Sequence, residues 1–279
     1  MARDDELAFA FLRLNQREEK PRQRGLTEIR GPYYSALGPR YLRDLLETVG
    51  HAIDIFKFSG GSFAVMPKRA VRELIDICHE HRVLVSTGGF IERVLLDGAD
   101  AVEHYLDECK RLGFDVVEVS SGFLCVPTED LLRLTERVKE HGLAPKPEVN
   151  IQPGAGGSSS VTALEAQGER DVSRAIEEAR RHLELGARHV MLESEGVTEN
   201  VREWRTDVVA AVVHALGLQK VMFEAADPAV FGWYVKTFGP EVNLFVDHSQ
   251  ALQLECLRAG VWGTSDVWGR VVTYKGRKR

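Results

Sequence analysis

One lysine in this sequence lies where a charged side chain should be unfavourable to bury. Residues 53–62 read IDIFKFSGGS, an apolar run that contains Lys57 and ends in a serine and glycine turn. Strand geometry puts Lys57 on the same face as the isoleucines two and four residues earlier, where it needs an anion. The N–H groups of Ser59, Gly60 and Gly61 can approach an oxyanion closely. We predict a catalytic Lys57 beside a substrate-binding turn; the alternative is a surface lysine before a plain turn.

Four glutamates share a second pattern, because each stands near the end of a predicted strand. They are Glu118, Glu148, Glu193 and Glu224. Carboxylates that converge repel one another unless protons or a cation intervene, and oxygen ligands suit Mg²⁺. We predict that all four ligate Mg²⁺, and that Glu118 and Glu148 are also catalytic. The alternative is that each is a surface residue at the end of a strand.

Other polar groups in the predicted strands and helices could hold an anionic substrate beside the metal. Arg30 ends the first predicted strand and would add a second positive charge to that of Lys57. Ser249 opens the last predicted helix, and the N–H groups at a helix N-terminus are suited to phosphate. Asn243 belongs to the last predicted strand. We predict that Arg30, Asn243 and Ser249 bind substrate.

The elements that must position these residues alternate regularly along the chain. Candidate strands cover residues 25–30, 53–58, 82–87, 114–120, 144–150, 188–193, 220–225 and 242–247. Candidate helices cover residues 40–49, 67–81, 101–112, 127–141, 168–185, 200–216, the segment from 227, and 249–259. This alternation predicts an α/β fold, a single-domain (β/α)8 TIM barrel. A doubly wound open sheet is the alternative, although no Gly-x-Gly-x-x-Gly motif follows the first strand.

The barrel is predicted to span residues 25–262. An N-terminal extension, residues 1–24, precedes it, with one short helix near residues 7–14. A C-terminal tail, residues 263–279, follows it. Residues 152–160, QPGAGGSSS, lie after the fifth strand and are rich in glycine and serine. We predict that this loop is mobile and is ordered by a ligand over the barrel mouth.

Composition excludes several classes of protein. The chain has 279 residues, of which 44% are hydrophobic and 28% charged, and a formal net charge of −6. This charge argues against nucleic-acid binding as its main role, and no apolar run is long enough to span a membrane. The four cysteines form no CxxC motif, which favours a reduced, cytoplasmic protein. We expect a homo-oligomer that binds a small anionic substrate.

Several runs of the sequence, in order, resemble the phosphosulfolactate synthase family. They are KFSGGS, STGG, DECKRLGFDVVEVSSG, KVMFEA, KTFGPEVNL and LECLRAG. The resemblance is stronger still to the plant heat-stress-associated branch, through EKPRQRGLTEIRGPYYS and NLFVDHSQALQLECLR. It implies a barrel that depends on Mg²⁺ and adds sulfite to phosphoenolpyruvate. Lys57, Glu118, Glu148, Glu193, Glu224 and Asn243 fall on matching family positions.

Two segments depart from the archaeal pattern of this family. The run that resembles EVGKK is EVNIQ at residues 148–152 and contains no lysine. In the run that resembles EGRESGK, Glu195 and Glu199 replace the arginine and the lysine. The sequence therefore leaves two hypotheses: a lyase of the phosphosulfolactate synthase type, or a heat-stress-associated barrel that is non-catalytic or catalyses something else.

Overall fold

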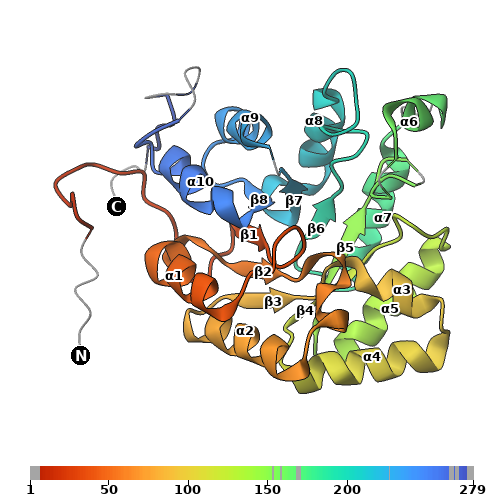
Figure 1. Ribbon diagram of the computed structural model, residues 1–279. Helices are drawn as coiled ribbons and strands as arrows, with labels where there is room; N and C mark the ends of the chain where they lie inside the picture. The colour runs from red at the N-terminus through yellow and green to blue at the C-terminus, as the bar shows by residue number, and fades with distance from the viewer. Residues whose placement is uncertain are drawn as a thin grey trace.

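Eight short parallel strands build the centre of the protein in this computed structural model. The structure describes residues 7–152, 154–157, 159–167, 171–225, 227–263, 267 and 270–274. The strands are β1 (Thr27–Arg30), β2 (Ile55–Lys57), β3 (Leu84–Ser86), β4 (Val116–Val119), β5 (Ala144–Val149), β6 (Val190–Leu192), β7 (Val221–Glu224) and β8 (Asn243–Asp247). They pair in chain order, and β1 closes the ring by pairing with β8 (Figure 1). The predicted single-domain (β/α)8 barrel is confirmed.

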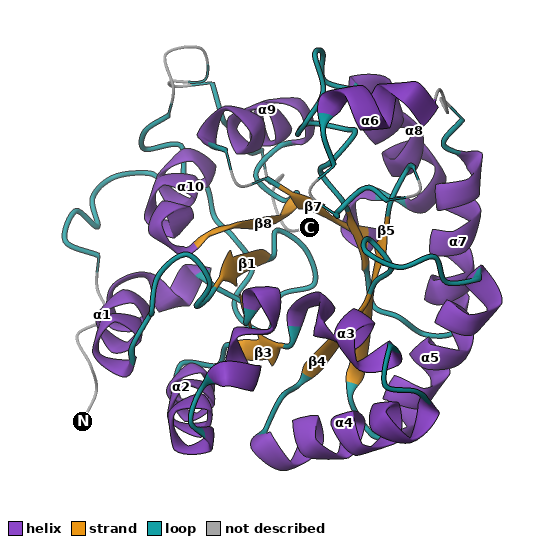
Figure 2. Ribbon diagram, turned by 45° about the vertical axis from the view of Figure 1, so that its right-hand side comes forward, coloured by secondary structure: helices purple, strands orange, loops and turns teal. Residues whose placement is uncertain are grey.

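Helices surround this barrel on the outside (Figure 2). They are α1 (Pro39–Val49), α2 (Lys68–Glu80), α3 (Ile91–Leu95), α4 (Ala99–Leu112), α5 (Thr128–Glu140), α6 (Val161–Gln167), α7 (Ser173–Glu184), α8 (Thr206–Leu216), α9 (Pro228–Phe238) and α10 (Ala251–Arg258). None of these described helices is both long and apolar enough to cross a bilayer.

Some helix boundaries differ from the prediction. Residues 7–14 contain turns and no helix, because so short a helix is marginal without packing partners. Residues 101–112 belong to α4, but α3 precedes it and is separated from it at Gly98, whose φ is 93°. The helix expected over residues 168–185 is α7, and residues 168–170 lie outside the described chain. Asn200 has a left-handed φ of 52°, so α8 begins only at residue 206.

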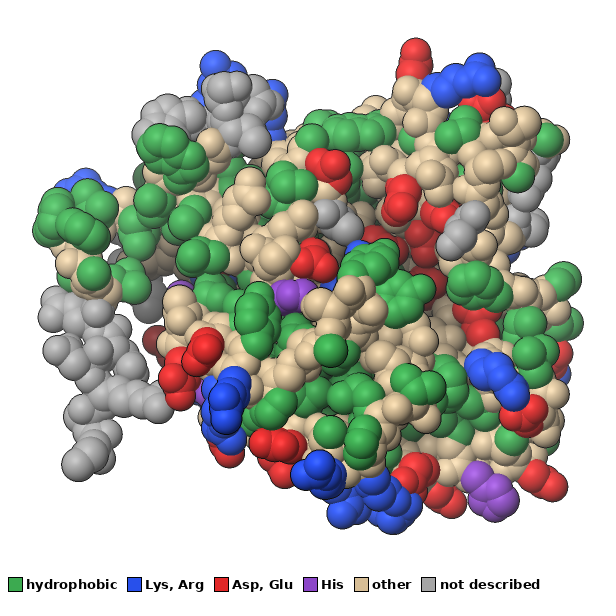
Figure 3. All heavy atoms as spheres, in the orientation of Figure 1, with side chains coloured by type: hydrophobic (Ala, Val, Ile, Leu, Met, Phe, Trp, Pro, Cys, Tyr) green, Lys and Arg blue, Asp and Glu red, His purple; other side chains and the backbone are tan. Residues whose placement is uncertain are grey.

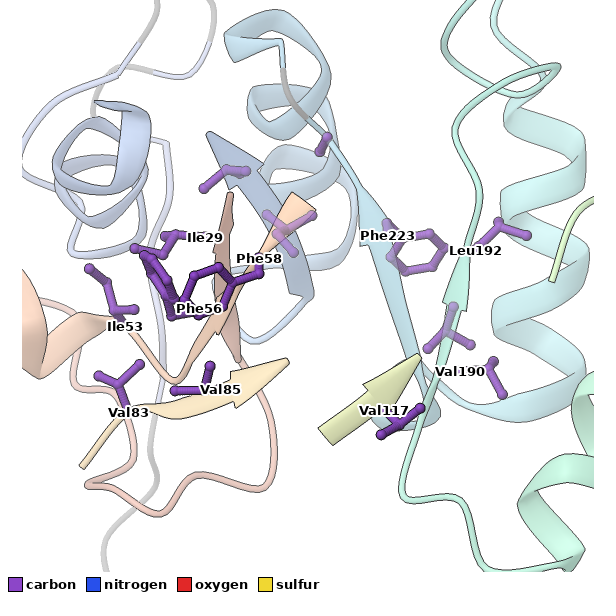
Figure 4. Close-up of a cluster of buried hydrophobic side chains, with 14 of the residues drawn as sticks. Ile29, Ile53, Phe56, Phe58, Val83, Val85, Val117, Val190, Leu192 and Phe223 are labelled. Carbon is purple, nitrogen blue, oxygen red and sulfur yellow. The ribbon is translucent and has the colours of Figure 1, made fainter. Parts of the chain in front are cut away.

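The strands alternate between two faces, and each face has its own apolar layer. The outward-facing layer packs under the helices and includes Ile29, Phe56, Val85, Val117, Leu192 and Phe223 (Figure 4). The inward-facing layer is smaller and consists of Leu26, Ile55, Met191, Met222 and Phe245. Charged side chains share this inward face, so the period of two directs them into the barrel interior.

The segment before β1 contacts the N-terminal end of the barrel. Arg22 is buried and forms a 2.9 Å ion pair with Asp54. Lys20 donates to the Gly50 carbonyl at 2.7 Å. Residues 7–24 of the predicted N-terminal extension are described, as are residues 263, 267 and 270–274 of the predicted tail. The remaining residues of both segments lie outside the described chain.

Candidate functional site

A cavity of about 560 Å³ opens at the C-terminal ends of the strands. Figure 3 shows acidic side chains in a hollow beside hydrophobic ones. The predicted residues that line it are Arg30, Lys57, Ser59, Gly60, Gly61, Glu118, Glu148, Glu193 and Glu224. Its lining also includes Tyr33, Tyr34, Gly89, Phe90, Glu92, Arg93, Leu96, Ser120, Phe123, Leu124, Gly156, Glu195, Glu199 and Phe245. The period-of-two pattern therefore brings the predicted cations and carboxylates to one site.

A chain of alternating charges forms the floor of this cavity. Lys57 Nζ lies 2.9 Å from Glu118 Oε2 and 3.9 Å from Glu148 Oε2. Lys146 Nζ contacts the same Glu118 oxygen at 2.9 Å and Glu28 Oε1 at 2.5 Å. All of these side chains except Glu148 are buried. The floor therefore holds Lys57 in place as a charged group.

The charges on the floor shift each other's pKa values in opposite directions. Burial alone acts to lower the pKa of Lys57, but the carboxylates of Glu118 and Glu148 outweigh it and raise that pKa. Burial acts to raise the pKa of Glu118, yet Lys146 and Lys57 lower it to about 2. Lys57 and Glu118 are therefore an ion pair at neutral pH.

The other three predicted metal ligands have fewer cations beside them than Glu118 has, so less of their negative charge is balanced. Burial and the neighbouring Glu118 raise the pKa of Glu148 well above its ordinary value. Burial and Glu224 raise the pKa of Glu193 to about 8. Burial also raises the pKa of Glu224, although Arg30 donates to its Oε1 at 3.1 Å. This side of the cavity therefore has a higher affinity for protons or for a cation.

The donor chemistry of this side suits a hard divalent cation, but the four carboxylates do not form a ready-made cage. Within the described ranges, no three His, Cys, Asp or Glu side chains are grouped closely enough to hold a metal ion. Glu118 already accepts from two lysines. Mg²⁺ commonly binds through one or two carboxylates, with water and substrate oxygens completing its shell. Glu148 and Glu193, whose raised pKa values mark uncompensated charge, fit that mode.

The glycine turn after β2 has a use that the sequence did not reveal. Gly60 and Gly61 have φ values of 59° and 65°. A Cβ atom at Gly60 would lie 2.1 Å from the ring of Tyr33, and one at Gly61 would lie 2.2 Å from the ring of Phe90. Both glycines line the cavity as predicted, and they also let two aromatic rings pack directly against the backbone.

Two predicted substrate-binding residues lie elsewhere. Asn243 is the first residue of β8, at the opposite end of the barrel, where its side chain accepts from Leu26 N at 2.9 Å and donates to the Val221 carbonyl at 3.1 Å. Ser249 is exposed, and its hydroxyl donates to Asp247 at 2.6 Å. Neither lines the cavity. The structure therefore brings neither residue to the site: the Asn243 side chain completes backbone hydrogen bonds at the other end of the barrel, and Ser249 donates to the Asp247 cap of its own turn.

The loop after β5 donates hydrogen bonds to a carboxylate of the protein itself, that of Glu195. The Gly156 and Ser159 N–H groups donate to Glu195 Oε2 at 2.8 and 3.2 Å, and Asn200 donates to the other oxygen at 3.1 Å. Glu195 is buried and lines the cavity. The described part of residues 152–160 is therefore fastened to the segment after β6. Its ordering by a ligand stays a prediction.

Sequence reasoning missed Glu92. This buried residue of α3 accepts from Ser120 Oγ at 2.7 Å and from the N–H groups of Gly122 and Phe123 at 3.1 and 2.7 Å. It fixes the loop after β4 at the rim of the cavity. No strand-end pattern marks it, because its helix follows β3 and only the closed barrel brings it beside β4.

The fold and site describe an α/β barrel with a buried lysine and a carboxylate cluster at the mouth. Among solved structures, the carboxyl transferase domain of Rhizobium etli pyruvate carboxylase matches 81% of this chain and 40% of its own, with a TM-score of 0.55 and 12% identity. The 3-hexulose-6-phosphate synthase of Salmonella typhimurium matches 85% of this chain and 100% of its own, with a TM-score of 0.51 and 10% identity. These likenesses show the fold alone.

Sequence comparison identifies the family. Residues 15–264 match the family described as (2R)-phospho-3-sulfolactate synthase (ComA), and this chain belongs to that family. Protein HEAT-STRESS-ASSOCIATED 32 of Arabidopsis thaliana is 41% identical over 89% of this chain and 91% of its own length. The phosphosulfolactate synthase of Methanothermobacter thermautotrophicus is 28% identical over 95% and 98%. The resemblance to this family and to its heat-stress-associated branch is confirmed.

Replacing Glu195 by alanine should loosen the loop after β5. The variant removes the carboxylate that accepts from Gly156 and Ser159, and a hydrogen bond to a charged group contributes about 1.5–3 kcal/mol. Amide hydrogen exchange in residues 154–159 should accelerate by about tenfold or more. Glu199→Ala is the control, because it removes a cavity carboxylate whose described bond is to Ser194 rather than to the loop. Equal exchange in both variants would contradict the fastening role.

The raised pKa of Glu193 should make the metal-free protein less stable as the pH rises. Between its ordinary value of 4.5 and about 8, the folded protein binds this proton more tightly than the unfolded chain does, so the free energy of unfolding falls across that window. The lowered pKa of Glu118 acts only toward pH 2. Glu193→Gln should flatten the decline of the melting temperature from pH 5 to 8 in a chelating buffer. An unchanged slope, equal to that of the exposed-site control Glu47→Gln, would contradict the assignment.

Proposed function

We propose that this barrel is a lyase-type enzyme that adds a nucleophile, sulfite or a related one, to phosphoenolpyruvate or a close analogue. The observation that carries the proposal is the fixed Lys57 ammonium on the floor of the cavity, between Glu118 and Glu148. Membership of the phosphosulfolactate synthase family supports this reaction type. A phosphorylated carboxylic acid is an anion that the Lys57 ammonium can attract in a site with little water.

Lys57 and Arg30 would hold the acid. Both lie on the inward face of neighbouring strands, where Arg30 aligns with Lys57 in the register of β1 and β2. Arg30 already forms an ion pair with Glu224, so a bound carboxylate or phosphate would compete with Glu224 for its guanidinium. The lone pair of the nucleophile forms a bond to the terminal carbon, and the electron pair of the double bond moves toward the carboxylate. Lys57 would stabilise that developing negative charge.

Glu148 is suited to supply the proton that completes the addition. Burial and the neighbouring Glu118 raise its pKa well above the ordinary value of a carboxyl group, and a raised pKa favours the protonated form that a general acid needs. The proton goes to the carbon that bears the phosphate, and water then reprotonates Glu148. Glu118 stays ionised and acts by positioning Lys57. The raised pKa of Lys57 disfavours it as the proton donor.

Mg²⁺ is proposed as the cofactor. Glu193 would share its binding with substrate oxygens, and Glu224 would order its waters, while Glu148 would lie beside them as the proton donor. When bound, the ion would neutralise part of the charge on the substrate's phosphate and carboxylate groups. This neutralisation matters here because glutamates outnumber basic residues among those that line the cavity.

The second candidate function is that of a stress-protective or interaction protein. In this case the barrel would act during heat stress and would not catalyse a reaction. It is favoured by Glu195 and Glu199, which add negative charge to the cavity, and by the 41% identity to HEAT-STRESS-ASSOCIATED 32. A site with this much negative charge repels a multiply charged acid unless a cation is present.

Turnover separates the two functions. Wild-type protein with phosphoenolpyruvate, sulfite and millimolar Mg²⁺ should consume both substrates, and Lys57→Met should lower kcat/KM by about a hundredfold or more. Lys68→Ala, an exposed lysine outside the cavity, should match the wild type. Melting curves check that each variant is folded. If the wild type and Lys57→Met are equally inactive with sulfite, thiosulfate and sulfide, the lyase function is wrong.

Mg²⁺ should raise the melting temperature at pH 8, where more of the cavity carboxylates are ionised. Binding to the folded state alone stabilises by mass action, by about 2.7 kcal/mol at a hundred times the dissociation constant. Glu193→Gln should abolish the gain, whereas Glu47→Gln should keep it. If Mg²⁺ raises the melting temperature equally in the wild type, the cavity variant and Glu47→Gln, the metal binds elsewhere in the protein.

A further inference from the structure

One half of the cavity mouth is apolar. Six described residues form this apolar wall, and they come from the segments that follow β1, β3 and β4: Tyr33, Tyr34, Phe90, Leu96, Phe123 and Leu124. The other side has glutamates from the ends of β5 and β7 and from the segment after β6: Glu148, Glu193, Glu195, Glu199 and Glu224. The cations of Lys57 and Arg30 lie on the floor between the two halves. The mouth is therefore divided into an apolar and an acidic side.

The apolar wall is exposed to a degree that a small polar substrate would not explain. Tyr34 is 77% exposed, Phe123 70%, Leu96 65% and Tyr33 56%. Large apolar side chains grouped on a concave surface mark a binding site rather than a random part of the surface. A phosphorylated three-carbon acid has polar groups at nearly every atom and offers almost no apolar area to cover them. The wall therefore lacks a use in binding that acid alone.

Local contacts hold the wall in place. The two glycines after β2 let the rings of Tyr33 and Phe90 pack against the backbone, where any Cβ atom would clash. The Arg30 guanidinium lies 5.2 Å from the centroid of the Tyr34 ring. Glu92 accepts from the Phe123 N–H at 2.7 Å. These contacts fix the rings of Tyr33 and Phe90 and the backbone of Phe123, so these parts of the wall lose little conformational entropy when a ligand binds.

The size of the cavity also favours a larger ligand. Its volume of about 560 Å³ lies in the range of about 300–1,000 Å³ that drug-sized molecules occupy. If the anionic head of a ligand sits on Lys57 and Arg30, the remaining space extends along the apolar wall, since the acidic side repels more negative charge. Complementarity therefore calls for an anionic head joined to an apolar body.

We propose that the substrate is a phosphorylated enol acid that carries an apolar, planar substituent, such as an aryl group on its terminal carbon. Its phosphate and carboxylate groups bind Lys57 and Arg30, and its ring lies against Tyr34 and Phe123. The nature of the acid head rests on the proposed function, whereas the apolar substituent rests on the wall.

Isothermal titration with two ligands tests this inference in the presence of Mg²⁺. The probes are phosphoenolpyruvate and its 3-phenyl derivative. The phenyl ligand should bind at least about tenfold more tightly, because a buried aromatic ring contributes apolar contact that the small acid lacks. Leu96→Ala combined with Phe123→Ala, two wall residues that are 65% and 70% exposed, should remove most of this advantage and leave the affinity for phosphoenolpyruvate within about twofold. Phe11→Ala, which changes a ring that is 81% exposed outside the cavity, should match the wild type.

Three results would overturn the inference. One is that the phenyl ligand binds no more tightly than phosphoenolpyruvate, or that neither binds. A second is that the double variant weakens both ligands equally, which would mean that the wall closes over a small substrate. A third is that the double variant changes the sedimentation coefficient and not the affinity, which would assign the wall to a contact between copies of the chain. Tight binding of the phenyl ligand by a protein that adds a nucleophile to neither acid would reject the proposed reaction and keep this inference.

Discussion

The site depends on four charges that alternate through the barrel interior, those of Glu28, Lys146, Glu118 and Lys57. Their side chains are between 0% and 9% exposed. A buried charge that loses its partner costs several kcal/mol. Replacing any one of these four residues by an uncharged one would therefore destabilise the others. Because the first three are enclosed by the strands, the position and charge of Lys57 follow from the fold itself. The cation that meets a substrate is thus held by the same contacts that fill the barrel.

The alternation of side chains along each strand explains why so much of the site could be predicted. A period of two assigns Lys57, Glu118 and Glu148 to one face, and eight βα units in order leave one end of the barrel where those faces meet. The same rule does not bring Asn243 to the site, because a period of two assigns a face and not an end, and Asn243 is the first residue of β8. Lys146 was overlooked for another reason: its partner Glu28 is 118 residues away in the chain, and only barrel closure pairs them.

Features made by loops could not be predicted, because each has more than one physical interpretation. The glycines at positions 60 and 61 could approach an anion or an aromatic ring, and only the placement of Tyr33 and Phe90 decides for the rings. Exposed aromatic residues in loops carry no periodic pattern, so Tyr34 and Phe123 gave no signal in the sequence. Their proximity to one cavity is a property of the closed barrel, which brings the segments after β1 and β4 to the same mouth.

Glu195 connects the loop after β5 with the charge of the whole cavity. Its carboxylate accepts the loop N–H groups that could otherwise have met a substrate anion, and it lies among glutamates whose pKa values burial already raises. An anionic ligand that enters this cavity must therefore bring a cation, gain protons, or avoid the acidic side. The third course places the ligand against the aromatic residues after β1 and β4. Repulsion by the acidic side restricts the anionic head of such a ligand to Lys57 and Arg30, and the apolar side is then the part of the mouth that suits an uncharged body.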